Sequence, residues 1–158
     1  MVSPDTGSAL LARIEDVIAA TPGRDAAVLA ALRLVAERLP HYRWVGVYLL
    51  DVGMLNLGPY VGEPTEHTLI PVGQGVCGTA VALKQNQVVS DVRTLDNYLA
   101  CSALTRSEIV VLIRDPATGT ILGQIDADGH EVGAFDASDE AFLEQVAARF
   151  APLYTHGR

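Results

Sequence analysis

The spacing of the apolar residues changes twice along the chain, and this change limits the folds that the sequence can adopt. Near both ends the apolar residues recur every three or four positions, which is typical of amphipathic helices. Between the ends they fall in short β-branched and aromatic runs, which are typical of strands. The pattern predicts an α+β protein with helices at both ends and a sheet in the middle.

Helix signals divide the two ends of the chain into defined segments. The expected helices are a pair over residues 9–39 that is interrupted at Thr21-Pro22-Gly23, a short helix over Thr79–Lys84, and a C-terminal helix over residues 137–154. Asp136 is a good N-cap for the last helix because its carboxylate can accept from the free amides of the first turn. Residues 1–8 show no apolar period, so we expect them to be disordered.

Short runs between residues 44 and 128 have the composition of strands. They are Trp44–Leu50, Met54–Leu57, Thr68–Ile70, Val88–Val89, Glu108–Ile113 and Ile121–Ala127. Pro116-Ala117-Thr118-Gly119 has turn chemistry, so the two runs beside it are expected to pair as a hairpin. We predict one domain over residues 1–158, with the N- and C-terminal helices packed on one face of a mostly antiparallel sheet.

The charge of the chain argues against several kinds of partner. The formal net charge is −8 and the 11 basic residues form no run, so long-range electrostatics oppose binding to nucleic acid and to anionic lipid. No apolar stretch reaches the roughly 20 residues of a membrane helix, and the N-terminus lacks the pattern of a secretory signal. We therefore expect a cytoplasmic protein with a small soluble ligand.

Strand alternation gathers polar side chains on one face of the expected sheet. Residues two apart on a strand share a face, so Gln124, Asp126 and Asp128 lie together, opposite the apolar Ile125 and Ala127. A lone aspartate is usually an ordinary surface acid, so a solvated sheet face is the alternative explanation.

Neighbouring strands can complete a pocket around these acids. Glu108 on the partner strand would bring a third carboxylate to the patch, and Trp44 and Tyr48 share one face of the first strand. Mutual repulsion and partial burial would raise the pKa of at least one carboxyl group. A carboxylic acid that stays protonated can donate a proton, so the patch is a candidate catalytic site.

The two cysteines are candidate reactive groups. Cys77 lies in the glycine-rich segment Gly73–Ala80 just before an expected helix, where free amides and the helix dipole would stabilise a thiolate. Cys101 lies in the long connection Asp91–Arg106, and a loop of that length in a compact domain is usually functional. Both cysteines can instead be small apolar residues that fill a turn and close a loop, and the residues alone leave both interpretations open.

Segments of the chain resemble, in order, the signatures of the free methionine-(R)-sulfoxide reductase family. They are Trp44-Val45-Gly46-Val47-Tyr48, Leu57-Gly58-Pro59-Tyr60, Gly75-Val76-Cys77-Gly78-Thr79-Ala80, Asp91-Val92, Cys101–Val111 and Gln124-Ile125-Asp126-Ala127-Asp128. The resemblance implies a GAF-domain fold. It also implies a cytoplasmic oxidoreductase of oxidative-stress defence that reduces the free amino acid and is frequently a homodimer.

The resemblance assigns roles to both cysteines. Cys101 matches the catalytic cysteine, whose thiolate would attack the sulfoxide and become a sulfenic acid. Cys77 matches a cysteine that recycles this product through a disulfide, which thioredoxin or a small thiol would reduce. The implied reaction needs no metal and no organic cofactor.

The resemblance also assigns roles on the polar face. Glu108, Asp126 and Asp128 match acids that hold and polarise the substrate, and Trp44 matches the aromatic that packs on its methyl end. Tyr48, on the same face as Trp44, is expected to belong to the same substrate-binding wall.

Three positions depart from the family pattern. His67 stands where many members have a further cysteine that often resolves the oxidised enzyme, so recycling must use Cys77 or an external thiol. Gln124 replaces a usually aliphatic residue and Gly129 a usual serine.

Two other functions are compatible with the sequence. A GAF module can bind a small ligand and signal without chemistry, as a partner subunit or as an enzyme that has lost turnover with the missing cysteine. His67 and Cys77 could bind a metal, but a gap of nine residues between them matches no usual ligand spacing, so we predict no metal site.

Overall fold

The described part of the chain is built around a six-stranded antiparallel sheet. The structure, a computed structural model, describes residues 1–99 and 102–155. The strands are β1 (Trp44–Asp51), β2 (Met54–Val61), β3 (Leu69–Pro71), β4 (Gln87–Val89), β5 (Ser107–Arg114) and β6 (Ile121–Gly129). The helices are α1 (Pro4–Ala20), α2 (Arg24–Arg38), α3 (Gly75–Leu83) and α4 (Ala137–Thr155), with a 3-10 turn η1 (Val92–Thr94). Within the described ranges, no helix is long and apolar enough to cross a membrane.

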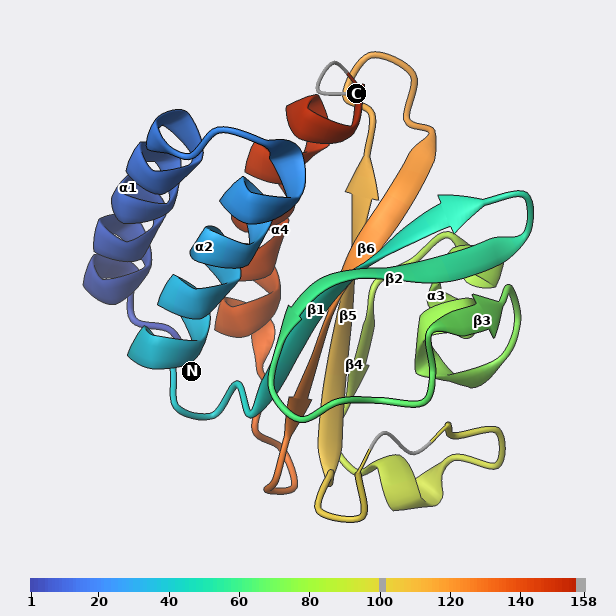
Figure 1. Cartoon of the computed structure of the whole chain (residues 1–158). Helices are drawn as coiled ribbons and strands as arrows, with labels where there is room; N and C mark the ends of the chain where they lie inside the picture. The colour runs from blue at the N-terminus through green and yellow to red at the C-terminus, as the bar shows by residue number, and fades with distance from the viewer. Residues whose placement is uncertain (100–101, 156–158) are drawn as a thin grey trace.

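Helices α1, α2 and α4 cover one face of the sheet (Figure 1). The side chains of β1, β5 and β6 that belong to this helical core are apolar and buried. They are Val45, Val47, Ile109, Val111, Ile113, Ile125 and Ala127. Strand alternation explains the pattern because successive side chains point to opposite faces. The predicted α+β arrangement, with the N- and C-terminal helices on one face, is confirmed.

The opposite face of the sheet carries α3 (Figure 1). A second cluster of buried apolar residues packs there, and it includes Trp44 and Tyr48 of β1, Cys77 of α3 and Val110 of β5. The residues that we expected on the polar face therefore lie under α3 and its flanking loops rather than in open solvent.

The strand order brings the candidate site residues next to one another. The order is β3-β2-β1-β6-β5-β4, so β6 lies between β1 and β5. Asp128 of β6 pairs with Trp44 on one side and with Glu108 on the other. Asp126 pairs with Gly46 of β1 and with Val110 of β5. The predicted β5–β6 hairpin is confirmed, and it sets the two aspartates of β6 beside the glutamate of β5.

Residues 1–8 are ordered, so our expectation of disorder was wrong. Helix α1 begins directly after Ser3, whose hydroxyl accepts a hydrogen bond from the Thr6 amide at 3.2 Å. The Val2 side chain is buried, and its amide donates to the Ser138 hydroxyl at 2.8 Å. The sequence did not indicate this order because the stabilising contact comes from the distant helix α4.

Helix α3 begins earlier than predicted. We expected a helix from Thr79, but it starts at Gly75, so the glycine-rich segment forms its first turn. A Cβ atom on Gly78 would lie 2.5 Å from the Pro71 carbonyl oxygen, so only glycine lets the helix approach the turn after β3 this closely. Cys77 therefore lies inside the first turn of α3 rather than before it.

A buried aspartate ties the start of α4 to the segment before β1. The fully buried Asp139 carboxylate accepts from the Tyr42 hydroxyl at 2.9 Å and from the Asp136 amide at 3.0 Å, and it lies 2.7 Å from His41 Nε2. Asp136 caps the helix as predicted, because its side chain accepts a hydrogen bond from the Ser138 amide at 2.9 Å. Burial raises the pKa of Asp139, but its hydrogen bonds outweigh burial and hold that pKa well below its usual value.

Replacing this carboxylate should destabilise the fold. We expect Asp139→Asn to lower the free energy of unfolding by about 2–4 kcal/mol at neutral pH, because buried donors lose an ionised acceptor. A depressed pKa contributes stability above the unfolded value of about 4, and that stability is lost as the pH falls below it.

Urea unfolding of wild type and variant between pH 3 and pH 7 measures both effects. The difference between the two proteins should shrink in acid. A difference that stays constant with pH would show that the charge of Asp139 has no part in stability.

Candidate active site

Polar side chains from three elements meet on the α3 side of the sheet. Glu108 of β5, Asp126 and Asp128 of β6 and Cys77 of α3 are all at most 4% exposed. Cys77 Sγ lies 3.8 Å from Glu108 Oε2. The Cys77 sulfur, one carboxylate oxygen of Glu108 and one of Asp126 all lie within 4.8 Å of one another. The structure thus brings together Cys77 and the acids that alternation placed on this face.

Burial sets the protonation of the two aspartates. It raises the pKa of Asp126 despite the lowering effect of the adjacent Glu108 and Cys77 side chains. It also raises the pKa of Asp128 well above its usual value, and the negative charge of Asp126 raises that pKa further. Among the described residues, no partner within hydrogen-bond geometry reaches the carboxyl oxygens of either aspartate, so burial outweighs the lowering effect of Glu108 and Cys77 on Asp126.

The thiol of Cys77 is not held as a thiolate. We expected the start of a helix to lower its pKa, but burial and then the nearby charges of Asp126, Glu108 and Asp128 raise that pKa well above its usual value. The expectation was wrong because the helix-terminus effect is small beside desolvation next to three acids.

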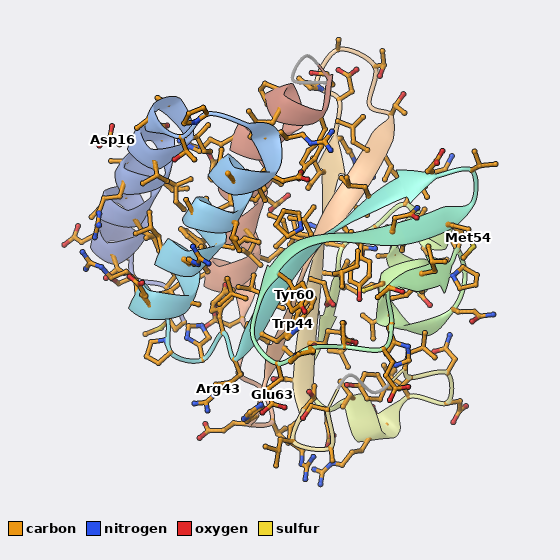
Figure 2. The ribbon with its side chains drawn as sticks, in the orientation of Figure 1. Asp16, Arg43, Trp44, Met54, Tyr60 and Glu63 are labelled. Carbon is orange, nitrogen blue, oxygen red and sulfur yellow. The ribbon has the colours of Figure 1, made fainter. Side chains whose placement is uncertain are left out.

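Trp44 forms an aromatic wall of a cavity next to the acids. Its indole Nε1 donates to the Glu63 carbonyl at 3.0 Å, and its ring stacks on Tyr60 with centroids 5.4 Å apart (Figure 2). The cavity has a volume of about 470 Å³. Residues that line it include Arg43, Trp44, Glu63, Ser102, Leu104 and Asp128. The volume suits a free amino acid, and both an acid and an aromatic ring face it.

Glycines make the space in which the indole lies. A Cβ atom on Gly46 would lie 2.5 Å from Trp44 Cη2, and one on Gly62 would lie 2.6 Å from Trp44 Cδ1. Gly62 also has a φ of 136°, which favours glycine. Side chains at these two positions would displace the ring.

Tyr48 lies behind this wall. It is fully buried, its ring centroid lies 6.4 Å from that of Trp44, and its hydroxyl donates to the His67 carbonyl at 2.8 Å. Tyr48 lines neither the Trp44 cavity nor the smaller one beside Cys77. Its position supports the wall and fixes the segment after β2.

The smaller cavity lies on the Cys77 side of the acids. It has a volume of about 10 Å³, and His67, Cys77, Leu99, Glu108 and Asp126 are among the residues that line it. The Trp44 cavity is thus much the larger of the two and opens onto Asp128.

Cys101, the expected catalytic cysteine, lies outside the described residues. Leu99, the last described residue before it, lines the small cavity, and Ser102, the first described residue after it, lines the Trp44 cavity. The described residues nearest to position 101 in the sequence therefore line the two cavities on either side of the acid cluster.

Gln124 has a contact that the sequence analysis did not anticipate. The side chain is fully buried, and its Nε2 donates to the Cys77 carbonyl at 3.2 Å. The family departure at this position was the available signal, because a buried amide on the polar face needs a partner. Gln124 therefore ties the first turn of α3 to β6.

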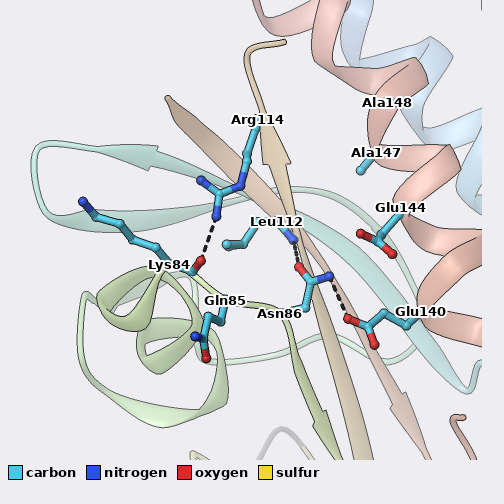
Figure 3. Close-up of a pocket in the computed structure, with 9 residues that line it drawn as sticks. All are labelled: Lys84, Gln85, Asn86, Leu112, Arg114, Glu140, Glu144, Ala147 and Ala148. Carbon is cyan, nitrogen blue, oxygen red and sulfur yellow. Dashed lines mark hydrogen bonds between the residues drawn. The ribbon is translucent and has the colours of Figure 1, made fainter. Parts of the chain in front are cut away.

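A separate cavity of about 460 Å³ lies between α4 and the end of α3 (Figure 3). Asn86 accepts from the Leu112 amide at 2.9 Å and donates to Glu140 at 2.9 Å, while Arg114 donates to the Lys84 carbonyl at 2.7 Å. These hydrogen bonds give polar side chains that line the cavity partners within the protein, and they attach Asn86 to the backbone of β5. No cysteine is among the described residues that line this cavity, so it offers no support for thiol chemistry.

Comparison with known proteins identifies the fold family. A family model for the GAF domain matches residues 24–152. The free methionine-R-sulfoxide reductase of Escherichia coli (strain K12) is 42% identical over 116 residues, which cover 73% of this chain and 68% of that protein.

Solved structures agree with this likeness. The type II free methionine-R-sulfoxide reductase of Thermoplasma acidophilum has a TM-score of 0.79 and 40% identity over 83% of this chain and 92% of that one. The free methionine-R-sulfoxide reductase of Neisseria meningitidis, solved in complex with its substrate, has a TM-score of 0.88 and 32% identity over 98% of this chain and 93% of that one.

The glycine that makes room for Trp44 provides a test of the site geometry. We expect Gly46→Ala to displace the indole, to shift its fluorescence emission to longer wavelength and to lower stability by about 1–3 kcal/mol, because the added methyl group overlaps the ring. The chain contains one tryptophan, so emission reports on Trp44 alone.

Gly7→Ala is the matched control for this substitution. Its Cβ would make only ordinary contacts, the nearest at 3.4 Å, and the emission maximum should not move. Unchanged emission in Gly46→Ala would contradict the packing described for Trp44.

Proposed function

The chain belongs to the free methionine-(R)-sulfoxide reductase family of GAF-domain oxidoreductases, and on this premise we propose that it reduces free L-methionine-(R)-sulfoxide to methionine. The observation that carries the proposal is the cluster of buried acids between the Trp44 cavity and Cys77. An ordinary surface patch would be solvated, whereas these carboxyl groups are desolvated beside a cavity of substrate size.

The walls of the Trp44 cavity fit the parts of this substrate. The indole offers an apolar surface for the methyl end, and Asp128 offers a carboxyl group to the ammonium group or to the sulfoxide oxygen. Glu108 and Asp126 lie farther in, where a protonated acid can polarise the S–O bond.

In the proposed reaction the Cys101 thiolate attacks the sulfoxide sulfur. A protonated member of the acid cluster gives its proton to the departing oxygen, which ends on the sulfur of Cys101 as a sulfenic acid while methionine leaves. The sulfoxide is reduced by two electrons and the cysteine is oxidised by two. The elevated pKa values of Asp126 and Asp128 support the presence of a protonated acid in the cluster.

Recycling is proposed to use the second cysteine. Cys77 would condense with the sulfenic acid to form a disulfide and water, and thioredoxin or a small thiol would reduce this disulfide by exchange. With His67 in place of the further family cysteine, these two cysteines are the thiols that the chain itself provides. The family resemblance also supports a homodimer that acts in the cytoplasm.

Substitution of Cys101 tests the reaction. We expect Cys101→Ser to abolish methionine formation from the free (R) isomer with dithiothreitol as reductant, because the thiolate that attacks the sulfoxide is removed. Chromatography of released methionine measures this, with the free (S) isomer as a second substrate that wild type should not reduce. Retained turnover in the variant would refute the mechanism, and substrate binding without product in wild type would favour a non-catalytic GAF module.

Substitution of Cys77 separates chemistry from recycling. We expect Cys77→Ser to form about one methionine per chain in a single turnover without reductant, since the attack itself needs only Cys101. Multiple turnover with thioredoxin should fall by at least about tenfold, because the disulfide that thioredoxin reduces cannot form. Equal thioredoxin-dependent rates in wild type and variant would remove Cys77 from the recycling step.

A further inference from the structure

The small cavity beside Cys77 is lined by groups that carry negative charge when ionised. Cys77 of α3, Glu108 of β5 and Asp126 of β6 each direct a donor atom to within 4.8 Å of the others. Lysine and arginine are absent from the described residues that line this cavity. Among the described residues, the three groups therefore share a buried site that no lysine or arginine lines.

Asp126 gives a second, independent observation. It is 1% exposed, lines the cavity, and neither carboxyl oxygen accepts a hydrogen bond from the described residues. A buried carboxylate in this situation is normally protonated, paired with a charge or bound to a metal ion.

The size of the cavity limits what can occupy it. A volume of about 10 Å³ is near the minimum for one water molecule, so the space accepts a single ion but no organic ligand. Cys77 Sγ and Glu108 Oε2 are 3.8 Å apart, close to the roughly 3.6 Å that a tetrahedral zinc ion imposes between a thiolate and a carboxylate ligand.

We propose that Cys77, Glu108 and Asp126 bind one thiophilic divalent cation, represented by Zn²⁺, and that this ion inhibits the protein. One thiolate and two carboxylates match the borderline-soft character of zinc better than the all-oxygen preference of Mg²⁺ or Ca²⁺. A water molecule completes the coordination. The inhibitory part of the proposal rests on the proposed function, whereas the binding site does not.

Inhibition follows from which groups the ion occupies. Binding forms a zinc–sulfur bond at Cys77 and releases to solvent the thiol proton and any proton held by the Glu108 and Asp126 carboxyl groups, with no change in oxidation state. The bound sulfur cannot condense with a sulfenic acid, and the two carboxylates no longer face the substrate. The ion therefore opposes both recycling and the first chemical step.

Cobalt substitution tests the site without any measurement of activity. The sequence contains two cysteines, so Cys101→Ser leaves Cys77 as the only thiol. Titration of this reduced variant with Co²⁺ should produce a thiolate-to-cobalt charge-transfer band in the near ultraviolet, and Zn²⁺ should remove the band by displacing cobalt. A second substitution, Cys77→Ser, should abolish it.

Acid substitutions in the Cys101→Ser background define the ligands. Glu108→Gln and Asp126→Asn should each weaken Co²⁺ binding by at least about tenfold, with thermal unfolding measured to show that the variants are folded. Glu66→Gln, at an exposed acid near the cavity, is the control and should bind Co²⁺ as before. Absence of the band, its survival without Cys77, or an affinity in both acid variants equal to that of the Cys101→Ser parent would overturn the site.

Turnover of the wild-type protein tests inhibition separately. Zn²⁺ should stop reduction of free methionine-(R)-sulfoxide, and a chelator should restore it. Full turnover in saturating Zn²⁺ would overturn the inhibitory role. A wild-type protein that reduces no sulfoxide would defeat the proposed function, while the cobalt titration would still decide the metal site.

Discussion

The pairing of β1, β6 and β5 is the constraint on which the rest of the structure depends. Its register places Asp128 between Trp44 and Glu108. The same pleat turns Ile125 and Ala127 into the helical core. A shift of one residue in β6 would bury the aspartates among α1, α2 and α4 and turn the apolar residues to the α3 side. The helical core therefore fixes the register, and the register fixes the acid cluster.

The acid cluster is costly to the fold and useful for chemistry. Burial of Asp126 and Asp128 without hydrogen bonds from the described residues is unfavourable for the ionised forms, and their pKa values rise accordingly. Such groups hold a proton to higher pH than an exposed carboxyl group does, and they respond to a cation that enters the site. Asp139 shows the opposite case, because hydrogen bonds keep it ionised and make it a structural anchor.

Local patterns predicted much of the fold and part of the site. The period change located the helices and strands, and alternation alone sorted Asp126 and Asp128 from Ile125. Predictions from these patterns were wrong where contacts with residues distant in the sequence determine order or pKa. Val2 is ordered by a contact with α4, and the Cys77 thiol is governed by the acids that surround it rather than by its place in α3.

The sequence by itself determined the class of fold, the face on which each strand residue lies and the family to which the chain belongs. These properties depend on spacing along the chain and on short motifs. Tertiary structure alone decided that Cys77, Glu108 and Asp126 share a cavity of about 10 Å³, because they come from α3, β5 and β6. Tertiary packing sets the desolvation of these side chains and the distances between them, and the spacing of residues along the chain contains no information on either.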